Sequence, residues 1–286
     1  MPNLNAFALR ARLIRKPHEH KGDMGKVLLV GGAPGMAGAI FLSAYGSLYS
    51  GAGWTIIGIL DSKSAHVQVD QPELMVQDIS EVVNARNFIE RMQSDSLAIG
   101  PGLGLSDQAL QFLEASLAFP GPLILDADAL NLIAEHPRLA QLLREREDPC
   151  TITPHPGEAA RLLGMSVDEI QANRSGAIQR LIDQLQCYVA LKGHHTLVGS
   201  PADVIYTCNA GNPGMATGGM GDVLTGLIAS LAAQGICHHL NLWEATCLAV
   251  ELHARAADQL VQSGIGPNGM TALELAKAVR ELMNQT

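Results

Sequence analysis

The sequence predicts an α/β fold built on a mostly parallel sheet with helices on both faces. Short β-branched or leucine-rich runs alternate with alanine-rich helical stretches along the chain, and this alternation is typical of a parallel sheet covered on both sides. Five of the apolar runs end in a glycine, proline, Asp or His turn that leads into a helix. Ligands bind beyond the carboxyl ends of the strands in open parallel sheets, so these turns are expected to meet at one crevice.

The elements follow from the apolar runs in chain order. Parallel strands are expected at Val27–Val30, Trp54–Ile59, Leu97–Ile99, Leu123–Leu125, Thr151–Thr153 and Tyr188–Leu191. A hairpin is expected from Leu197–Val198 and Val204–Cys208. Helices are expected from Ala39 to about Ser50 and at about 223–234, 243–261 and 271–283. No internal repeat, low-complexity segment or long linker divides the 286 residues, so one domain over 1–286 is expected.

The charge balance excludes two classes of partner. Nineteen Lys and Arg residues against 28 Asp and Glu residues give a net charge of −9, the wrong sign for coating a nucleic acid or an anionic membrane surface. Apolar residues make up 47% of the chain, which excludes wholesale disorder. A nucleotide partner stays possible, because glycine loops bind phosphate through backbone N–H groups without cationic side chains.

The cysteines and the start of the chain indicate a cytoplasmic protein. Five cysteines are scattered without a C-x-x-C pair, which is typical of reduced thiols. No run is expected to reach the ~20 apolar residues that span a bilayer. The first residues lack the apolar core of a signal peptide.

The segment Asn209–Asp222 carries the strongest functional pattern. Four of its glycines lie close together, at Gly214, Gly218, Gly219 and Gly221. They free the backbone to direct successive N–H groups at one point, and a helical pattern starts directly afterwards, where the helix dipole favours phosphate. Asp222 places a carboxylate beside that anion site. It can accept a proton from a substrate hydroxyl while the amides hold the phosphoryl group under attack. The simpler alternative is that Asp222 is an N-cap.

Two further glycine loops follow expected strands. Gly31–Gly38 opens a helix, but it lacks the Lys-Ser/Thr ending of a phosphate loop and does not match G-x-G-x-x-G. It is either a phosphate loop or a tight turn that lets the helix pack closely. Gly100–Gly104 predicts a close approach of the backbone to a ligand.

Ionisable side chains follow the next strands. Prolines on both sides of His155 restrict its backbone, as expected where a side chain is aimed at a ligand. The alternative is a rigid turn in which Glu158 completes the first turn of a helix, and the pattern favours neither. Asp126 and Asp128 are expected either to cap the following helix or to bind Mg²⁺ through water.

Histidine pairs occur in three places. Lys192–Thr196 ends a strand with a cation, a glycine and three hydrogen-bonding side chains. This favours the polar lining of a nucleotide pocket over zinc, because structural zinc needs four well-spaced ligands. His18–His20 and His238–His239 are interpreted as solvated polar residues.

Taken together, the motifs resemble those of the ADP-dependent NAD(P)H-hydrate dehydratases, which belong to the ribokinase-like carbohydrate kinase superfamily. The resemblance covers roughly residues 10 to 283. It is carried by His20–Gly25, Val30–Gly38, Ser50–Gly53, Gly100–Gly104, Asp126–Asn131, Thr153–Glu158, Lys192–Thr196 and Asn209–Asp222.

This resemblance implies a three-layer α/β/α sandwich and a repair activity. Members of the family use ADP and Mg²⁺ to convert (6S)-NADHX and NADPHX to NAD(P)H, with release of AMP and phosphate. Many relatives carry a fused N-terminal epimerase, for which a single domain over 1–286 leaves no room. A homo-oligomer is expected, as is common in the family.

The resemblance also implies roles for individual residues. The nucleotide-binding residues are Lys192, Gly193, His194, His195, Thr196 and Gly221. The substrate-binding residues are Ala39, Gly102 or Gly104, His155 and Asp222. Asp222 is the catalytic base, the backbone of Gly219, Met220 and Gly221 forms the anion hole, and Glu158 helps to hold Mg²⁺ indirectly. Met220 and His155 depart from the superfamily's sugar kinases, which have Ala and Asn there, and both departures favour a dehydratase.

Two other functions compete with this one. A small-molecule kinase of the same superfamily, acting on hydroxyethylthiazole or a sugar, would use the same base and anion hole, but with ATP and another alcohol. A nucleotide sensor without catalysis is disfavoured, since a pure binder has no use for Asp222 and Glu158 beside a phosphate.

Overall fold

A nine-stranded sheet forms the centre of the computed structural model, which describes residues 1–66, 71–202 and 204–285. Its strands are β1 Lys26–Gly31, β2 Trp54–Ile59, β3 Leu74–Asp78, β4 Ser96–Ile99, β5 Leu123–Leu125, β6 Cys150–Ile152, β7 Tyr188–Leu191, β8 Leu197–Gly199 and β9 Tyr206–Thr207. The strand order is β3-β2-β1-β4-β5-β6-β7-β8-β9. Neighbours from β3 to β7 are parallel, and β8 and β9 are antiparallel. The predicted strands and hairpin are thus confirmed, while β3 was not predicted.

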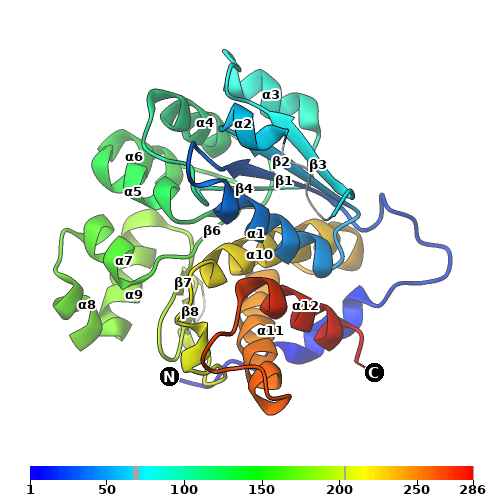
Figure 1. Ribbon diagram of the computed structural model, residues 1–286. Coiled ribbons are helices and arrows are strands. Elements are labelled where there is room, and N and C mark those ends of the chain that lie inside the picture. Colours follow the sequence, from blue (N-terminus) through cyan, green and yellow to red (C-terminus); the bar gives the residue numbers. More distant parts are fainter. Residues whose placement is uncertain (67–70, 203, 286) are drawn as a thin grey trace.

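Helices cover both faces of the sheet (Figure 1). One face carries α1 Ala37–Tyr49, α10 Met220–His238, α11 Leu242–Gln262 and α12 Ala272–Met283. The other carries α3 Ala85–Met92, α4 Asp107–Leu117, α5 Asp128–Glu135, α6 Pro137–Arg144, α7 Pro156–Leu163, α8 Val167–Ala172 and α9 Arg174–Leu185. Each face has its own apolar core. The expected α/β/α sandwich is therefore confirmed, as are its last three helices.

The helix α10 lies in the core, packed against α1, β1 and β4. By length and composition alone it could cross a membrane, so the expectation that no apolar run is long enough was wrong for this segment. In the fold, 78% of its most apolar window is buried, as expected of a core helix. Two glycines set its distance from α1. A Cβ on Gly226 would lie 1.7 Å from the Ser43 oxygen, and one on Gly46 would lie 2.4 Å from the Val223 oxygen.

The turns after the parallel strands meet at one edge of the sheet, as predicted. The Ala33 N–H after β1 donates to the Gly102 oxygen after β4 at 2.6 Å. The Lys192 N–H after β7 donates to the Pro154 oxygen after β6 at 2.8 Å. The N-terminus of α10 reaches the same edge, where Thr225 hydrogen-bonds a carboxylate that follows β5. The fold therefore gathers the predicted loops into one place.

One histidine pair differs from expectation. His238, at the end of α10, is buried, and its Nε2 lies 3.2 Å from Glu19 Oε1 while its Nδ1 lies 2.9 Å from the Gln234 oxygen. The prediction that these histidines are solvated is thus wrong for His238 and correct for His18, His20 and His239. A sequence pattern does not reveal that the segment around Glu19 folds back over the end of α10.

Candidate active site

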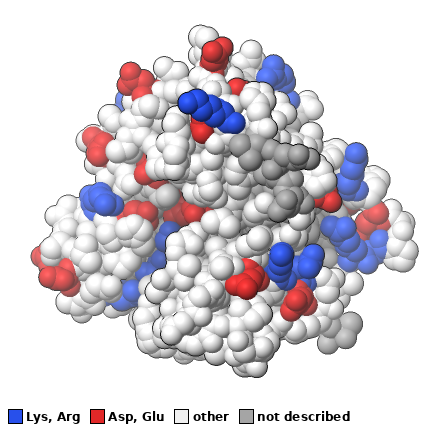
Figure 2. All heavy atoms as spheres, viewed as in Figure 1, with Lys and Arg blue, Asp and Glu red and all other residues white. Residues whose placement is uncertain are grey.

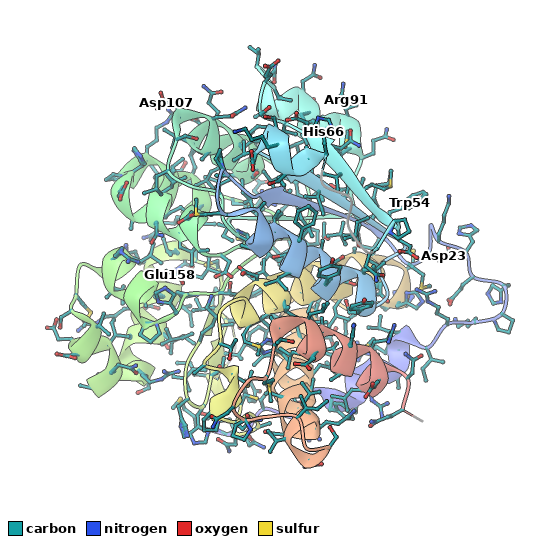
Figure 3. The ribbon with its side chains drawn as sticks, viewed as in Figure 1. Asp23, Trp54, His66, Arg91, Asp107 and Glu158 are labelled. Carbon is teal, nitrogen blue, oxygen red and sulfur yellow. The ribbon has the colours of Figure 1, made fainter. Side chains whose placement is uncertain are left out.

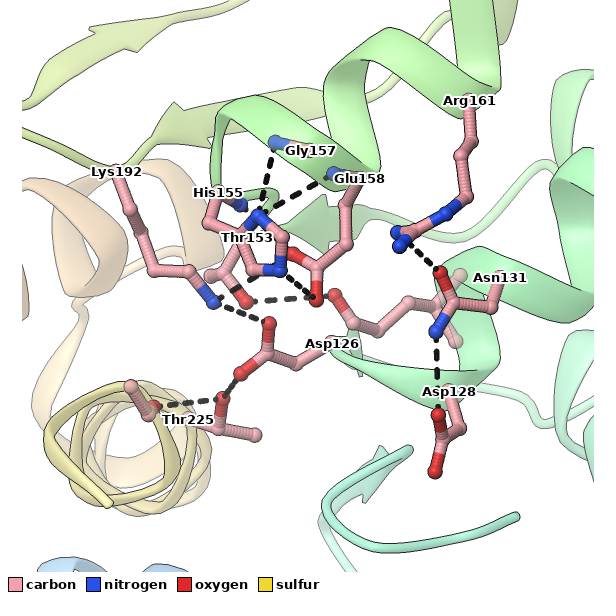
Figure 4. A network of polar contacts seen from close by, with 12 residues as sticks. Asp126, Asp128, Asn131, Thr153, His155, Gly157, Glu158, Arg161, Lys192 and Thr225 are labelled. Carbon is pink, nitrogen blue, oxygen red and sulfur yellow. Dashed lines mark hydrogen bonds and ion pairs between the residues drawn. The ribbon is translucent and has the colours of Figure 1, made fainter. Parts of the chain in front are cut away.

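A partly buried lysine joins two carboxylates at the edge of the sheet (Figure 4). Lys192, directly after β7, places its Nζ 2.6 Å from Asp126 Oδ1 and 3.8 Å from Glu158 Oε2. Asp126 follows β5, Glu158 lies in the first turn of α7, and both are buried. Neither Asp126 nor Asp128 caps α5, whose N-cap is Ala127 without a side-chain hydrogen bond. The capping alternative is therefore wrong, and the pairing of Asp126 with Lys192 was not predicted.

Thr225 connects this ion pair to α10. Its Oγ1 donates to Asp126 Oδ2 at 2.7 Å and lies 3.2 Å from the Gly221 oxygen. A Cβ on Gly221 would lie 3.2 Å from Lys192 Nζ, so the backbone of the glycine turn runs directly past the ammonium group. Thr225 was missed in the sequence, although it lies three residues after Asp222 and therefore on the same side of the helix.

Asp222 is the third residue of α10, and Gly219 is the N-cap, so the N-cap alternative for Asp222 is wrong. Burial raises the pKa of Asp222 to about 7. The negative charges of Asp126 and Asp128 add to this rise, and the charge of Lys192 opposes it. The side chain is therefore part of the electrostatic cluster at the sheet edge. A carboxyl group with a pKa near neutrality suits a general base.

Backbone donors without acceptors surround the start of α10. Within residues 204–285, which the structure describes, the N–H groups of Gly219, Gly221 and Asp222 have no hydrogen-bond acceptor, and that of Met220 makes only a 3.5 Å contact with the Thr217 oxygen. Gly219 has a φ of 90°, a backbone conformation that glycine adopts without steric cost. Orphan donors at a helix N-terminus form a site for an anion such as phosphate. The structure thus brings the residues of the predicted anion hole together at this helix start, with Asp222 N–H as a further donor and Met220 N–H as the weakest, and their role as an anion hole stays a prediction.

His155 and Glu158 form a reciprocal cap on α7. His155 Nδ1 accepts from Gly157 N–H at 2.9 Å and from Glu158 N–H at 3.3 Å, while Glu158 Oε2 accepts from His155 N–H at 2.7 Å. Because Nδ1 accepts, the proton resides on Nε2, 3.2 Å from Glu158 Oε1. Burial, and then the charge of Lys192, lower the pKa of His155, and burial raises that of Glu158 to about 7. The rigid-turn interpretation is thus confirmed. The half-exposed ring also stays open to a ligand.

The predicted substrate residues Ala39, Gly102 and Gly104 lie in two neighbouring segments, the first turn of α1 and the loop after β4. A Cβ on Gly102 would lie 2.5 Å from the Met36 oxygen and 3.3 Å from the Ala39 Cβ, so the two loops are in direct contact. Asp128 Oδ2 accepts from Gly104 N–H at 2.8 Å. This hydrogen bond ties the loop after β4 to the acidic cluster.

The loop Lys192–Thr196 is held by Arg174, which the sequence did not indicate. The guanidinium donates to the carbonyl oxygens of Leu191, Lys192 and His195 at 3.1 to 3.4 Å. His194 and His195 are exposed, with ring centroids 3.8 Å apart. Over the described parts of the chain, no three His, Cys, Asp or Glu side chains form a metal-binding group. The loop thus presents polar side chains on a fixed backbone.

The ionisable side chains of the site lie at one side of the molecule. Figure 2 shows acidic and basic side chains meeting in a hollow between the part of the molecule that carries α7–α9 and the part that carries α10–α12. In Figure 3, Glu158 lies at this side, while Asp23 and Trp54 lie at the opposite end of the sheet. The ionisable cluster is therefore confined to the carboxyl edge of the parallel strands.

Known proteins share this chain's sequence and fold. A family model described as NAD(P)H-hydrate dehydratase matches residues 27–281. An ADP-dependent (S)-NAD(P)H-hydrate dehydratase from Neisseria meningitidis serogroup B is 38% identical, over 95% of this chain and 89% of that protein. A bifunctional NAD(P)H-hydrate repair enzyme, Nnr, from Coxiella burnetii is 40% identical over 93% of this chain, and the chain spans about half (51%) of that relative's length.

A solved structure extends the comparison to three dimensions. The ADP/ATP-dependent NAD(P)H-hydrate dehydratase from Bacillus subtilis, co-crystallised with ATP and Mg²⁺, superposes with a TM-score of 0.83 at 29% identity. The match covers 98% of this chain and 97% of that one. A ribokinase-like superfamily protein from Enterococcus faecalis superposes with a TM-score of 0.77 at 30% identity, over 96% of this chain and 93% of that one, so the ribokinase-like architecture expected from the sequence is confirmed.

Proposed function

The chain belongs to the NAD(P)H-hydrate dehydratase family, and on that premise we propose that it catalyses the ADP-dependent dehydration of (6S)-NADHX and NADPHX to NAD(P)H, AMP and phosphate. One observation carries the proposal. The acceptor-free amides at the start of α10 lie in the same helical turn as Asp222, whose pKa of about 7 suits a base at neutral pH.

The first step is a phosphoryl transfer in which Asp222 is the base. Its carboxylate accepts the proton of the ring hydroxyl while that oxygen forms a bond to the β-phosphorus of ADP. The bond between the β-phosphorus and the bridging oxygen breaks, and AMP leaves with the electron pair. The amides of Gly219, Gly221 and Asp222 stabilise the charge on the transferred group, and Lys192 adds a positive charge beside Gly221.

The second step is an elimination. The carbon–oxygen bond of the phosphate ester breaks, phosphate leaves with the electron pair, and the adjacent ring carbon loses a proton, so that the double bond re-forms. Of the two protons removed in the whole reaction, one remains on phosphate as HPO₄²⁻ and the other is released to solvent. Phosphate is a far better leaving group than hydroxide, which explains the need for a nucleotide.

The donor set of the site fits Mg²⁺ held mainly through phosphate and water. Asp126, Asp128, Glu158 and Asp222 outnumber the cations Lys192 and Arg161, and this surplus of negative charge favours a divalent ion. No three carboxylates of the described residues converge as direct ligands, in agreement with the few protein ligands that Mg²⁺ usually takes. Glu158 would hold the ion indirectly. When bound, the ion would neutralise charge on the phosphates.

The two substrates would bind to different sets of residues at the edge of the sheet. Lys192, Gly193, His194, His195, Thr196 and Gly221 would bind ADP, while Ala39, Gly102, Gly104 and His155 would contact the hydrated nicotinamide. The loop 192–196, which Arg174 holds by hydrogen bonds, and the contact between Gly102 and Met36 support this division.

We further propose a cytoplasmic homo-oligomer without nucleic-acid or membrane partners. The five cysteines, which form no disulfide among the described residues, support the location.

Recovery of reduced-nicotinamide absorbance from NADHX, with and without ADP, tests the proposal. We expect recovery only when ADP and Mg²⁺ are present, with AMP and phosphate formed in equal amounts. The competing kinase of hydroxyethylthiazole or a sugar would instead require ATP and leave NADHX unchanged. The relative named as an ADP-dependent dehydratase, at 38% identity, favours the first outcome. Phosphorylation of such an alcohol without conversion of NADHX would refute the proposal.

A further inference from the structure

Two side chains of α11 hold the glycine turn 209–222 at separate points, and the proposed reaction uses neither of them. Near the start of the turn, Asp258 Oδ2 accepts from Gly211 N–H at 2.8 Å and Oδ1 accepts from Asn212 Nδ2 at 3.1 Å. Near its end, His253 Nε2 lies 2.9 Å from the Met220 oxygen. The backbone between these two points is therefore fixed to one helix of the core.

The ring of His253 has one protonation state that fits this contact. A carbonyl oxygen only accepts, so Nε2 carries the proton and donates it. The side chain is buried, and burial lowers the pKa of His253 to about 4, helped by the charge of Lys192. The imidazole is therefore neutral at physiological pH. In a buried position it is a fixed hydrogen-bond donor with no charge.

The acceptor of this hydrogen bond belongs to the anion hole itself. The Met220 carbonyl and the Gly221 N–H are two ends of one peptide group, which is planar and trans. Holding the oxygen on one side of that plane fixes the direction of the N–H on the other. The Gly221 N–H is one of the amides without an acceptor, and its backbone lies beside Lys192 Nζ. A hydrogen bond to the oxygen also polarises the peptide and strengthens its N–H as a donor.

We propose that His253 is a positioning residue, which orients the Met220–Gly221 peptide so that the Gly221 N–H faces the phosphoryl group during transfer, while Asp258 fixes the opposite end of the turn. This inference rests on the proposed function for its kinetic consequence, but not for its structural one. It assigns α11 a role in the reaction that acts through the backbone of the glycine turn.

Three variants separate positioning from simple support of the fold. His253→Leu removes the donor, whereas His253→Gln keeps an N–H at about the same reach. His238→Gln is the matched control, because His238 is also buried but contacts Glu19 and Gln234 at the far end of α10. We expect His253→Leu to lower kcat roughly 10–100-fold with little change in the KM for ADP, since a misplacement of about 1 Å can cost about 100-fold. His253→Gln should recover most of that loss. His238→Gln should lower Tm without this change in kcat.

An NMR measurement on the full-length chain keeps the inference independent of turnover. In the wild type, ADP with Mg²⁺ should shift the amide resonance of Gly221. In His253→Leu that resonance should already differ before ADP is added, and the shift on binding should shrink, with recovery in His253→Gln. If the wild type binds ADP without converting NADHX, the proposed function fails while this test still applies. An unchanged Gly221 resonance and kcat in His253→Leu, or an equal kcat loss in His238→Gln at equal Tm, would overturn the inference.

Discussion

The chemistry of the site depends on the balance between one lysine and four carboxyl groups. Lys192 lies 2.6 Å from Asp126 and 3.8 Å from Glu158, so its charge is largely compensated before any ligand arrives. Glu158 and Asp222 are then left in buried surroundings with pKa values of about 7. A divalent cation held beside these carboxyl groups would favour their ionised forms. Binding of the ion would therefore lower the pKa of the proposed base.

The pH profile of turnover follows from Asp222. Its carboxylate is the active form, so kcat/KM for NADHX should rise about tenfold per pH unit below pH 7 and level off above it. Recovery of NADH absorbance between pH 5.5 and 9 measures this. Asp222→Asn should lower turnover by about 10²–10⁴-fold and leave ADP binding by calorimetry largely intact. Near-wild-type turnover in Asp222→Asn would rule out the base assignment.

The carboxyl group of Asp222 makes the free energy of unfolding fall as the pH rises, whereas a surface acid in an ion pair makes it rise. Its pKa is about 7 in the folded state and 3.8 for the unperturbed group, so the folded chain binds more protons between these values. Its contribution to the free energy of unfolding is fully present below pH 4 and is lost as the pH rises through 7. Asp222→Asn should therefore raise the free energy of unfolding at pH 8 by on the order of 1–3 kcal/mol, with little effect at pH 4. Urea unfolding at the two pH values measures the difference.

Removal of Lys192 should damage both folding and binding. Lys192→Met leaves the buried Asp126 without its cation, and loss of one partner of a buried pair costs about 3–5 kcal/mol. We expect a lower urea midpoint and no calorimetric signal for ADP. Lys63→Met, at an exposed position, is the control and should change neither. The double variant Lys192→Met/Asp126→Leu should be less destabilised than the sum of the two single variants, and strict additivity would show that the pair is not coupled.

At this scale, the sequence predicted the side chains that stand in local motifs but not those that act across the fold. Asp222, His155 and Gly219 were predicted because turn and helix signals surround them. The Lys192–Asp126 pair joins positions 66 residues apart, and Arg174 and His253 act on backbone carbonyl oxygens, which leave no mark in a sequence. Sequence spacing does not encode such distant hydrogen bonds.

Among the elements, α10 links the core to the chemistry. Its first turn carries Asp222 and the proposed anion hole, and the helix packs on α1 at Gly46 and Gly226. Any change in the distance between α1 and α10 therefore moves the first turn of α10, which carries Asp222. The strand β3 was not predicted because it lies at the edge of the sheet, with only Leu74 of its five residues buried. Its sequence therefore lacks the continuous apolar run of a central strand.

Gly226→Ala tests the packing of α10 on α1. The new Cβ would lie 1.7 Å from the Ser43 oxygen, and overpacking of a core typically costs about 1–3 kcal/mol, occasionally more. We expect a lower midpoint of urea unfolding and a lower kcat, because the helices must separate. Gly38→Ala is the control in α1, where no atom lies within 4 Å of the new Cβ, and it should leave stability unchanged or increase it by up to about 1 kcal/mol. Equal stability of the two variants would contradict the packing argument.

For the whole molecule, the alternation of strands and helices was enough to predict the layers and the edge that carries the site, because connections between parallel strands place their carboxyl ends together. The contacts of the N-terminal segment were not predictable. Glu251 on α11 accepts from the N–H groups of Ala6 and Phe7, and Thr207 of β9 hydrogen-bonds Pro2 and Leu4. These contacts tie the first residues to elements more than 200 positions away.

The late position of α10 in the sequence affects how the chain folds while it is being synthesised. β1 and β2 are complete by Ile59, yet the helix that covers β1 and β4 ends only at His238. At about 5–20 residues per second, that interval lasts roughly 10 to 35 s. During that time α1 covers part of this face of the nascent sheet, while the part that later packs on α10 stays exposed to solvent until translation has passed residue 238.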